Sequence, residues 1–116
     1  MSDDMIALSR RAAACRGWRW MPGARWIVTR AAPLEDYAGR IVEGGRRAPD
    51  GPGLPDLTDP ATLGCLLALV REAYGDPWLY ARVDPEEVLW YVVTASGAAW
   101  SNTEAEALVA ALESAP

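Results

Sequence analysis

The sequence contains no His, no Lys and no Phe, and only two of its 116 residues are Cys. His is the commonest general base at neutral pH, so this chain alone cannot assemble a Ser-His-Asp or a Cys-His catalytic site. The absence of Lys removes Schiff-base nucleophiles and the P-loop. These absences exclude most common enzyme chemistry, and we expect a protein that is not an enzyme and needs no cofactor.

Ligands for metal ions are equally scarce. Without His, neither a Cys₂His₂ zinc site nor a two-His iron site can form. Cys15 and Cys65 lie far apart within predicted helices, beside apolar neighbours, which favours buried free thiols. The acidic residues at 84–87 and 104–106 lack the spacing of a metal-binding loop. We therefore predict no metal site.

The sequence also lacks a recognisable targeting or membrane segment. Residues 1–4 are acidic where a signal peptide would be basic, and Arg10 and Arg11 interrupt the apolar stretch that follows. The longest uncharged apolar run, 63–70, is far too short to cross a bilayer. The sequence thus predicts a soluble cytoplasmic protein with no membrane contact.

What the chain does contain is enough apolar surface for one folded domain. Hydrophobic residues make up 51% of the sequence, which excludes a disordered chain. We find no internal repeat and predict a single domain over residues 1–116. Residues 44–57 contain four Gly and three Pro, which helices and central strands do not tolerate, so we predict a flexible loop there.

Hydrophobic periodicity predicts an α+β fold, in which three helices pack on a small antiparallel sheet in the order α-β-β-α-β-β-β-α. Helices are expected over residues 3–16, over 59–74, and from Thr103 onward, where Thr103 and Glu106 form a capping box. Gly17 is the expected stop of the first helix.

Strand propensity places the sheet in two parts of the chain. Residues 18–43 are expected to form a hairpin or a loose pair of strands, since 26–29 strongly favours a strand. The later strands are expected over 78–83, 88–94 and 98–101. The middle one of these should lie centrally, because it is almost entirely β-branched or aromatic.

The helix over 59–74 is apolar nearly all round. Such a helix is usually buried on more than one side, so in a chain of this size it either lies centrally or forms an interface between subunits. The second case would give a homodimer through this helix.

Charge is unevenly distributed along the chain, although the net charge is only −5. Residues 5–30 contain six Arg and no acidic residue, whereas residues 59–116 contain two basic and nine acidic residues. Arg and Trp are interleaved in the basic segment, and two more Arg stand in the predicted loop. The candidate partner-binding residues are Arg16, Arg19, Trp20, Arg25, Trp26, Arg46 and Arg47.

The sequence leaves three interpretations of this Arg/Trp cluster open. Because the chain has no Phe, Trp must fill the core, and Trp18 and Trp20 would share one face of a strand with Arg19 opposite. Arg and Trp also dominate the hot spots of protein interfaces. Lastly, they can bind nucleic acid or another anion, although the net acidity of the chain argues against general nucleic-acid binding.

Three segments carry a family resemblance. They are CRGWRWMPG at 15–23, GLPDLTDPATLGCLLALVREAYGDPW at 53–78 and TEAEALVAAL at 103–112. Together they resemble a group of small proteins encoded by tailed phages and prophages, and they are similar to the phage ABA (α/β) sandwich domains. The resemblance covers less than half of the chain. It implies a phage origin, a sandwich fold and a place in the bacterial host cell, but it assigns no catalytic residue.

These features predict a non-enzymatic phage or prophage accessory protein that acts by binding a host or phage protein. A component of bacterial antiviral defence is the expected target, so that the protein would act like an anti-CRISPR inhibitor. Two alternatives stay open. One is a protein that binds or sequesters a nucleotide-like anion through Trp and Arg. The other is a structural phage protein that self-associates through the helix over 59–74.

Overall fold

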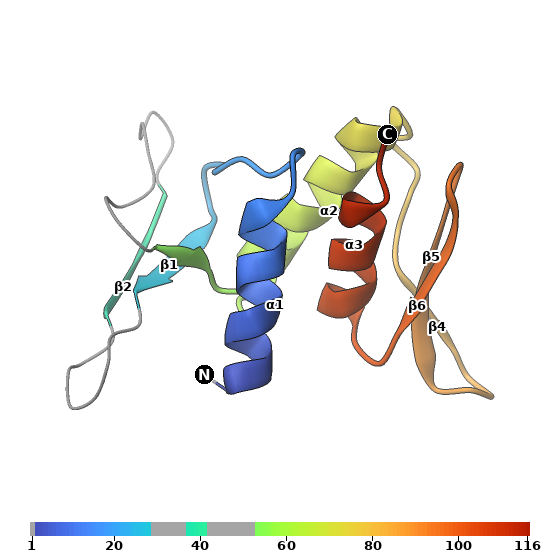
Figure 1. Ribbon diagram of the computed structural model, residues 1–116, viewed down its shortest axis with the longest axis horizontal. Helices are drawn as coiled ribbons and strands as arrows, with labels where there is room; N and C mark the ends of the chain where they lie inside the picture. The colour runs from blue at the N-terminus through green and yellow to red at the C-terminus, as the bar shows by residue number, and fades with distance from the viewer. Residues whose placement is uncertain (1, 29–36, 42–52) are drawn as a thin grey trace.

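The computed structural model describes residues 2–28, 37–41 and 53–116. Its elements form three layers, with the helices between two antiparallel sheets of three strands each (Figure 1). The predicted α+β class and order are confirmed, although the strands form two small sheets and not one, and a short strand is added before the second helix. The elements are α1 (Asp3–Ala14), β1 (Arg25–Val28), β2 (Tyr37–Arg40), β3 (Leu54–Pro55), α2 (Pro60–Tyr74), β4 (Arg82–Asp84), β5 (Leu89–Thr94), β6 (Gly97–Ser101) and α3 (Glu104–Glu113).

Each helix begins at a side chain that caps it. Oxygens of Ser2, Asp59 and Thr103 accept hydrogen bonds from the backbone N–H three residues further on, at O···N distances of 3.2, 3.0 and 3.1 Å. Each bond satisfies an N–H that the first helical turn leaves unpaired, which stabilises a helix by about 1 kcal/mol. At the other end of α2, Gly75 adopts the left-handed conformation (φ 62°) typical of helix ends.

The first helix ends earlier than the sequence predicts. The expected helix runs to residue 16 and stops at Gly17, but α1 ends at Ala14, where the backbone becomes extended. The chain turns there and places the Trp18 side chain against the core. A Cβ atom added to Gly17 would come within 2.9 Å of Leu112 Cδ1. Close packing on α3, and not helix termination, therefore accounts for the glycine.

The first sheet has the strand order β2–β1–β3. Both neighbours run antiparallel to β1, with Ile27 opposite Ala38 on one side and Leu54 on the other. The predicted pairing of two strands within 18–43 is thereby confirmed.

The third strand of this sheet lies inside the segment 44–57, which the sequence predicts to be a loop throughout. Residues 42–52 lie outside the described part of the chain, but the end of the segment forms β3, followed by the buried Asp56 and Leu57. Pro55 is tolerated because β3 is at the edge of the sheet, where a missing N–H costs no internal hydrogen bond.

The second sheet has the order β4–β5–β6, so β5 is central, as predicted. In its register, Tyr91 of β5 lies opposite Arg82 of β4 and Trp100 of β6. The strand predicted over 78–83 begins only at Arg82. The Asp76 side chain accepts a hydrogen bond from the Trp78 N–H (Oδ1···N 2.9 Å) and bends the chain just before that point.

The main core lies between the three helices and the inner face of the second sheet. Leu66 and Val70 of α2, Leu108 of α3 and Val92 of β5 are all completely buried there. Figure 1 shows α2 in the middle layer, which agrees with the central placement that its apolar surface predicts, while a homodimer through this helix stays a prediction. None of the described helices has the length and apolar character needed to cross a membrane.

Candidate functional site

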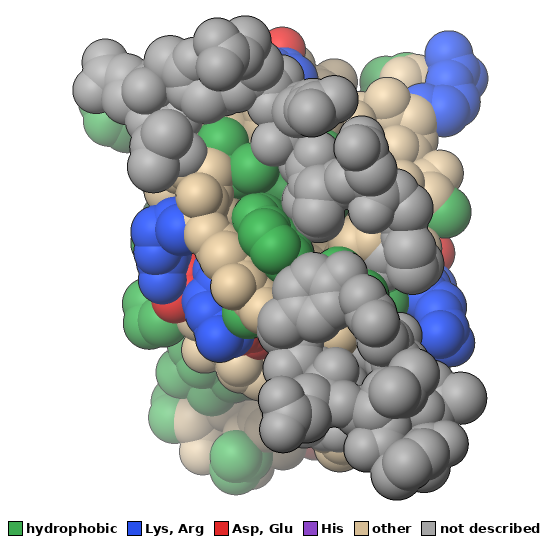
Figure 2. Space-filling model, turned by 90° about the vertical axis from the view of Figure 1, so that its left-hand side faces the viewer, with side chains coloured by type: hydrophobic (Ala, Val, Ile, Leu, Met, Phe, Trp, Pro, Cys, Tyr) green, Lys and Arg blue, Asp and Glu red, His purple; other side chains and the backbone are tan. Residues whose placement is uncertain are grey.

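Two of the three described arginines that are predicted to bind a partner form ion pairs with carboxylates of the same chain. Arg25 on β1 forms an ion pair with the buried Asp56, which follows β3. Arg19 forms an ion pair with Glu72 of α2 (Nη1···Oε2 2.6 Å), and Arg16 is exposed. Figure 2 shows the side of the molecule that carries the first sheet, where Arg side chains adjoin acidic ones. Two predicted residues lie outside the described part of the chain, Arg46 and Arg47.

The two tryptophans of the predicted set are half-buried and pack against neighbours. The Trp20 ring meets the Trp18 ring edge to face, with centroids 5.4 Å apart and planes at 83°. The Trp26 ring covers Gly39 of β2, because a Cβ atom there would lie 2.5 Å from Trp26 Cζ2. Both rings therefore contribute to packing between elements.

One carboxylate ties the first sheet to α2, and a second forms an ion pair within the sheet. Asp59, the N-cap of α2, accepts hydrogen bonds from both terminal nitrogens of Arg40 on β2 (Nη1···Oδ2 and Nη2···Oδ1, each 2.9 Å) and from the Thr62 hydroxyl (2.8 Å). These bonds, chiefly those from Arg40, hold the pKa of the Asp59 carboxyl well below its usual range. Asp56 accepts a hydrogen bond from one terminal nitrogen of Arg25, Nη1. We interpret this network as structural, because its charges neutralise one another.

The cysteines offer no activated nucleophile. Both are free thiols, and Cys65 is buried whereas Cys15 is half-buried. Burial raises the pKa of each thiol, which keeps it protonated and unreactive at neutral pH. Within the described ranges, no three metal-ligating side chains come together in a way that could hold an ion.

The outer face of the second sheet, by contrast, exposes large apolar side chains. Because side chains alternate along a strand, Val92 points to the helices and is buried, whereas Tyr91 and Val93 point away from them. Val93 is 57% exposed, Trp100 is 48% exposed, and Trp78, just before β4, is 83% exposed. We call the following residues the aromatic face: Trp78, Tyr80, Arg82, Tyr91, Val93 and Trp100.

The side chains of the aromatic face contact one another. The rings of Tyr91 and Trp100 are stacked, with centroids 4.5 Å apart and planes at 26°. The guanidinium carbon of Arg82 lies 4.4 Å from the centroid of the Tyr80 ring, which is a cation–π contact. Trp78 lines a surface pocket of about 290 Å³ together with Tyr80 and Arg82. The face therefore combines flat aromatic surface with a concave part.

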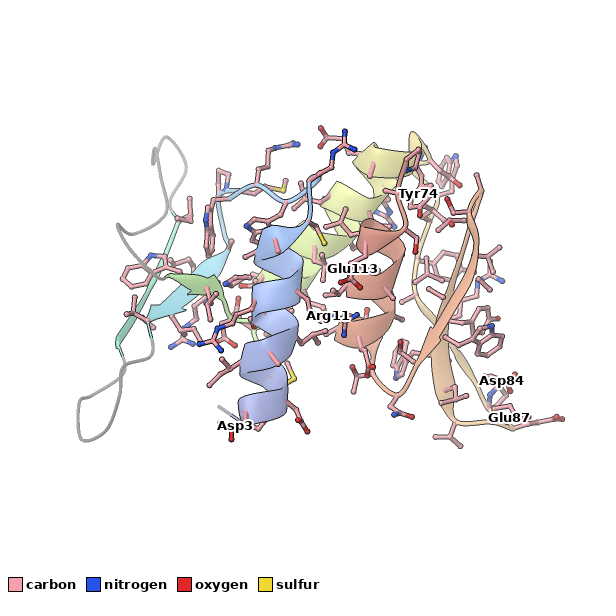
Figure 3. The ribbon with its side chains drawn as sticks, in the orientation of Figure 1. Asp3, Arg11, Tyr74, Asp84, Glu87 and Glu113 are labelled. Atoms are coloured by element: carbon pink, nitrogen blue, oxygen red, sulfur yellow. The ribbon has the colours of Figure 1, made fainter. Side chains whose placement is uncertain are left out.

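Acidic side chains flank the aromatic face. Residues 75–103 contain four acidic residues and one Arg, so this part of the chain has a net charge of −3. Asp76 lines the pocket, and Figure 3 shows Asp84 and Glu87 at the far end of the sheet. Among the described residues, none of the four carboxylates forms an ion pair. We call them the acidic rim: Asp76, Asp84, Glu86 and Glu87.

Sequence reasoning missed the aromatic face. An almost entirely apolar strand such as β5 is interpreted as buried on both sides, but an antiparallel sheet can leave one face to solvent. A signal was present in the alternation of Trp78, Tyr80 and Arg82, which places three large side chains on the same side of the chain.

No protein-family model, curated protein or solved structure matches this chain significantly. The resemblance to small phage proteins therefore stays a prediction.

Proposed function

We propose that this chain is a binding protein that holds another protein against the aromatic face. The observation that carries the proposal is the exposure of Trp78, at 83%, beside Tyr80 and Trp100, each 48% exposed. Aromatic side chains bury roughly 150–250 Å² each and are enriched in interface hot spots. An exposed apolar patch with a polar rim is typical of an interaction surface.

The state of the predicted Arg/Trp cluster supports the same choice. A small anion would have to displace Glu72 from Arg19 and Asp56 from Arg25 before it could use these guanidinium groups. Leaving the Asp56 carboxylate buried and unpaired would be unfavourable. The side chains of the aromatic face neutralise no buried charge of this chain. A partner can therefore cover them without disturbing the fold.

The variant Trp78→Ala tests the proposal. Because the side chain is mostly in solvent, we expect the free energy of unfolding to change by no more than about 0.5 kcal/mol. Affinity for the partner should fall ~30-fold, the effect of losing about 2 kcal/mol at a hot spot. The partner is isolated from bacterial lysate by crosslinking to the unmodified chain, identified by mass spectrometry, purified and titrated by calorimetry.

Arg16→Ala is the matched control, since Arg16 is exposed but belongs to the Arg/Trp cluster. We expect it to leave the affinity unchanged. A loss of affinity in Arg16→Ala without a loss in Trp78→Ala would contradict the proposal and assign binding to the cluster. The absence of any purified protein that binds the chain would also count against it.

For the identity of the partner, we propose a component of bacterial antiviral defence such as a CRISPR effector, bound inside the host cell. The support is the resemblance of segment 53–78 to phage proteins, together with the missing catalytic residue types. Expression of the chain in a host with an active defence system should restore plaques of a phage that the system blocks, and Trp78→Ala should abolish the effect. Unchanged plaque counts with the unmodified chain would contradict this proposal.

A further inference from the structure

The two edges of the second sheet differ in how open they are to a further strand. β4 has only three residues, two of them charged, and Pro85 follows it. Short length, charge and proline all discourage pairing at an edge. β6 has five residues, Gly97–Ser101, with neither a charged residue nor a proline. In the described part of the chain, no backbone group outside its hairpin with β5 bonds to β6.

Building on the function proposed above, we infer that the partner enters as an extended basic segment that adds a strand to β6. Backbone N–H and C=O groups along the open side of β6 would hydrogen-bond to that segment, as in other cases of strand addition. Alternate side chains of the segment would then point to the outer side of the sheet, beside the ring of Trp100. The aromatic face and the acidic rim beside it determine which side chains of the segment bind favourably there.

Charge complementarity points to Arg or Lys on the incoming segment. The four carboxylates of the acidic rim have no ion pair among the described residues, and residues 75–103 have a net charge of −3. The face already holds one guanidinium group, since Arg82 lies 4.4 Å from the Tyr80 ring centroid. A cation from the partner would find similar aromatic surface on Trp100, which β6 itself carries.

The same charges disfavour a second copy of this chain as the occupant. Residues 59–116 carry nine acidic and two basic residues. Pairing two β6 strands would bring two such halves together, with like charges facing each other across the interface.

The first experiment uses two synthetic ten-residue peptides, one alternating Arg with Val and one alternating Glu with Val. With ¹⁵N-labelled protein, the Arg peptide should shift the amide resonances of 97–101 and slow their hydrogen exchange about tenfold. The Glu peptide should do neither. Added salt should weaken binding of the Arg peptide, because exposed charges are screened beyond about 10 Å at 0.1 M ionic strength.

Two lysine variants separate strand addition from general charge attraction. Ala98 is exposed on β6, opposite Val93, and Ala95 is exposed in the turn that precedes β6. Ala98→Lys introduces a charge of the kind that blocks edge strands, and we expect it to weaken the Arg peptide about tenfold. Ala95→Lys changes the net charge equally and should weaken it less than about threefold.

If Ala98→Lys fails to fold, the double variant Glu86→Gln/Glu87→Gln, which removes two charges of the acidic rim, takes its place. Its control is Asp3→Asn/Asp4→Asn, which removes two charges from the first turn of α1. Figure 3 shows Asp3 at the start of α1 in the middle layer and Glu87 at the far end of the second sheet, well apart in the view. The rim variant should weaken the Arg peptide and the control should not.

Equal weakening by both lysine variants, or binding of the Arg peptide without exchange protection in β6, would overturn strand addition. Neither result would contradict the proposed function, because that function is tested separately by the affinity of Trp78→Ala for the purified partner. If light scattering shows a dimer of this chain and Ala98→Lys dissociates it, the occupant of the β6 edge is a second copy of the chain and not a basic segment of a partner. Equal affinity for the Arg and Glu peptides would contradict the positive charge that we assign to the incoming segment.

Discussion

The two sheets are equal in strand number and opposite in how they use their side chains. In the first sheet, Arg40 forms an ion pair with Asp59 at the start of α2, Arg25 forms one with Asp56 beside β3, and the Trp26 ring packs across the sheet on Gly39. The second sheet packs an apolar inner face on the helices and leaves aromatic rings in solvent on the other. Net charge along the chain is thus a poor guide to the binding surface, because most described arginines of the basic part are neutralised within the fold.

The largest expected effect is in the first sheet. Asp56→Ala removes a buried carboxylate and leaves Arg25 without its partner. Since the Arg25 side chain is 39% exposed, we expect a loss of about 3 kcal/mol, the low end for breaking a buried pair. Urea unfolding measures it. Asp84→Ala is the control in the second sheet, and a loss there as large as in Asp56→Ala would contradict the contrast between the sheets.

A second test concerns the contact between Trp26 and Gly39. In Gly39→Ala the new Cβ atom would lie 2.5 Å from Trp26 Cζ2, so the ring must move, and we expect destabilisation by about 2 kcal/mol. Gly64→Ala in α2 is the control, because nothing lies within 4 Å of its added Cβ. That variant should stabilise the helix by about 0.5–1 kcal/mol. Thermal unfolding of both variants would show whether Gly39→Ala lowers the stability of the protein and Gly64→Ala raises it.

A third test concerns a residue of the second sheet whose backbone conformation is strained. Val88, in the β4–β5 turn, has φ 55° and is 72% exposed. A β-branched residue is disfavoured in this conformation, whereas glycine adopts it readily. We expect Val88→Gly to stabilise the protein by about 1 kcal/mol in chemical denaturation. Val83→Gly, in the neighbouring strand, should destabilise it, and a gain in both variants would point to an effect on the unfolded chain.

The smallest effect should appear on acidification. The pKa of Asp59 is lowered in the folded state by Arg40, so pairing stabilises the fold above the ordinary Asp pKa of about 4. This stabilisation is lost as the pH falls below that value towards the folded pKa. Asp59→Asn should therefore show a weaker loss of stability between neutral pH and acid, measured by denaturation at each pH. An unchanged pH profile would show that the ion pair contributes nothing.

The parts of the fold that follow from neighbouring residues could be predicted from the sequence. The caps of α2 and α3 depend on groups three residues apart, and the β-branched and aromatic residues of β5 favour a strand. The end of α1 could not be predicted, because Gly17, the expected stop, lies outside the helix and packs closely against Leu112 of α3. For the site, the residue types of the aromatic face were visible, but the side of the sheet that the helices cover was not.

By itself, the sequence determined the excluded chemistry, the α+β class and the helix starts, since each depends on composition or on contacts within a few residues. Tertiary structure alone decided which arginines are neutralised and which aromatic rings are exposed. Arg11 and Glu113 are 102 positions apart, yet their side chains meet between α1 and α3 (Nη2···Oε1 2.6 Å; Figure 3). Such pairs form only when packing brings distant segments together, and the same packing leaves the outer side of the second sheet uncovered.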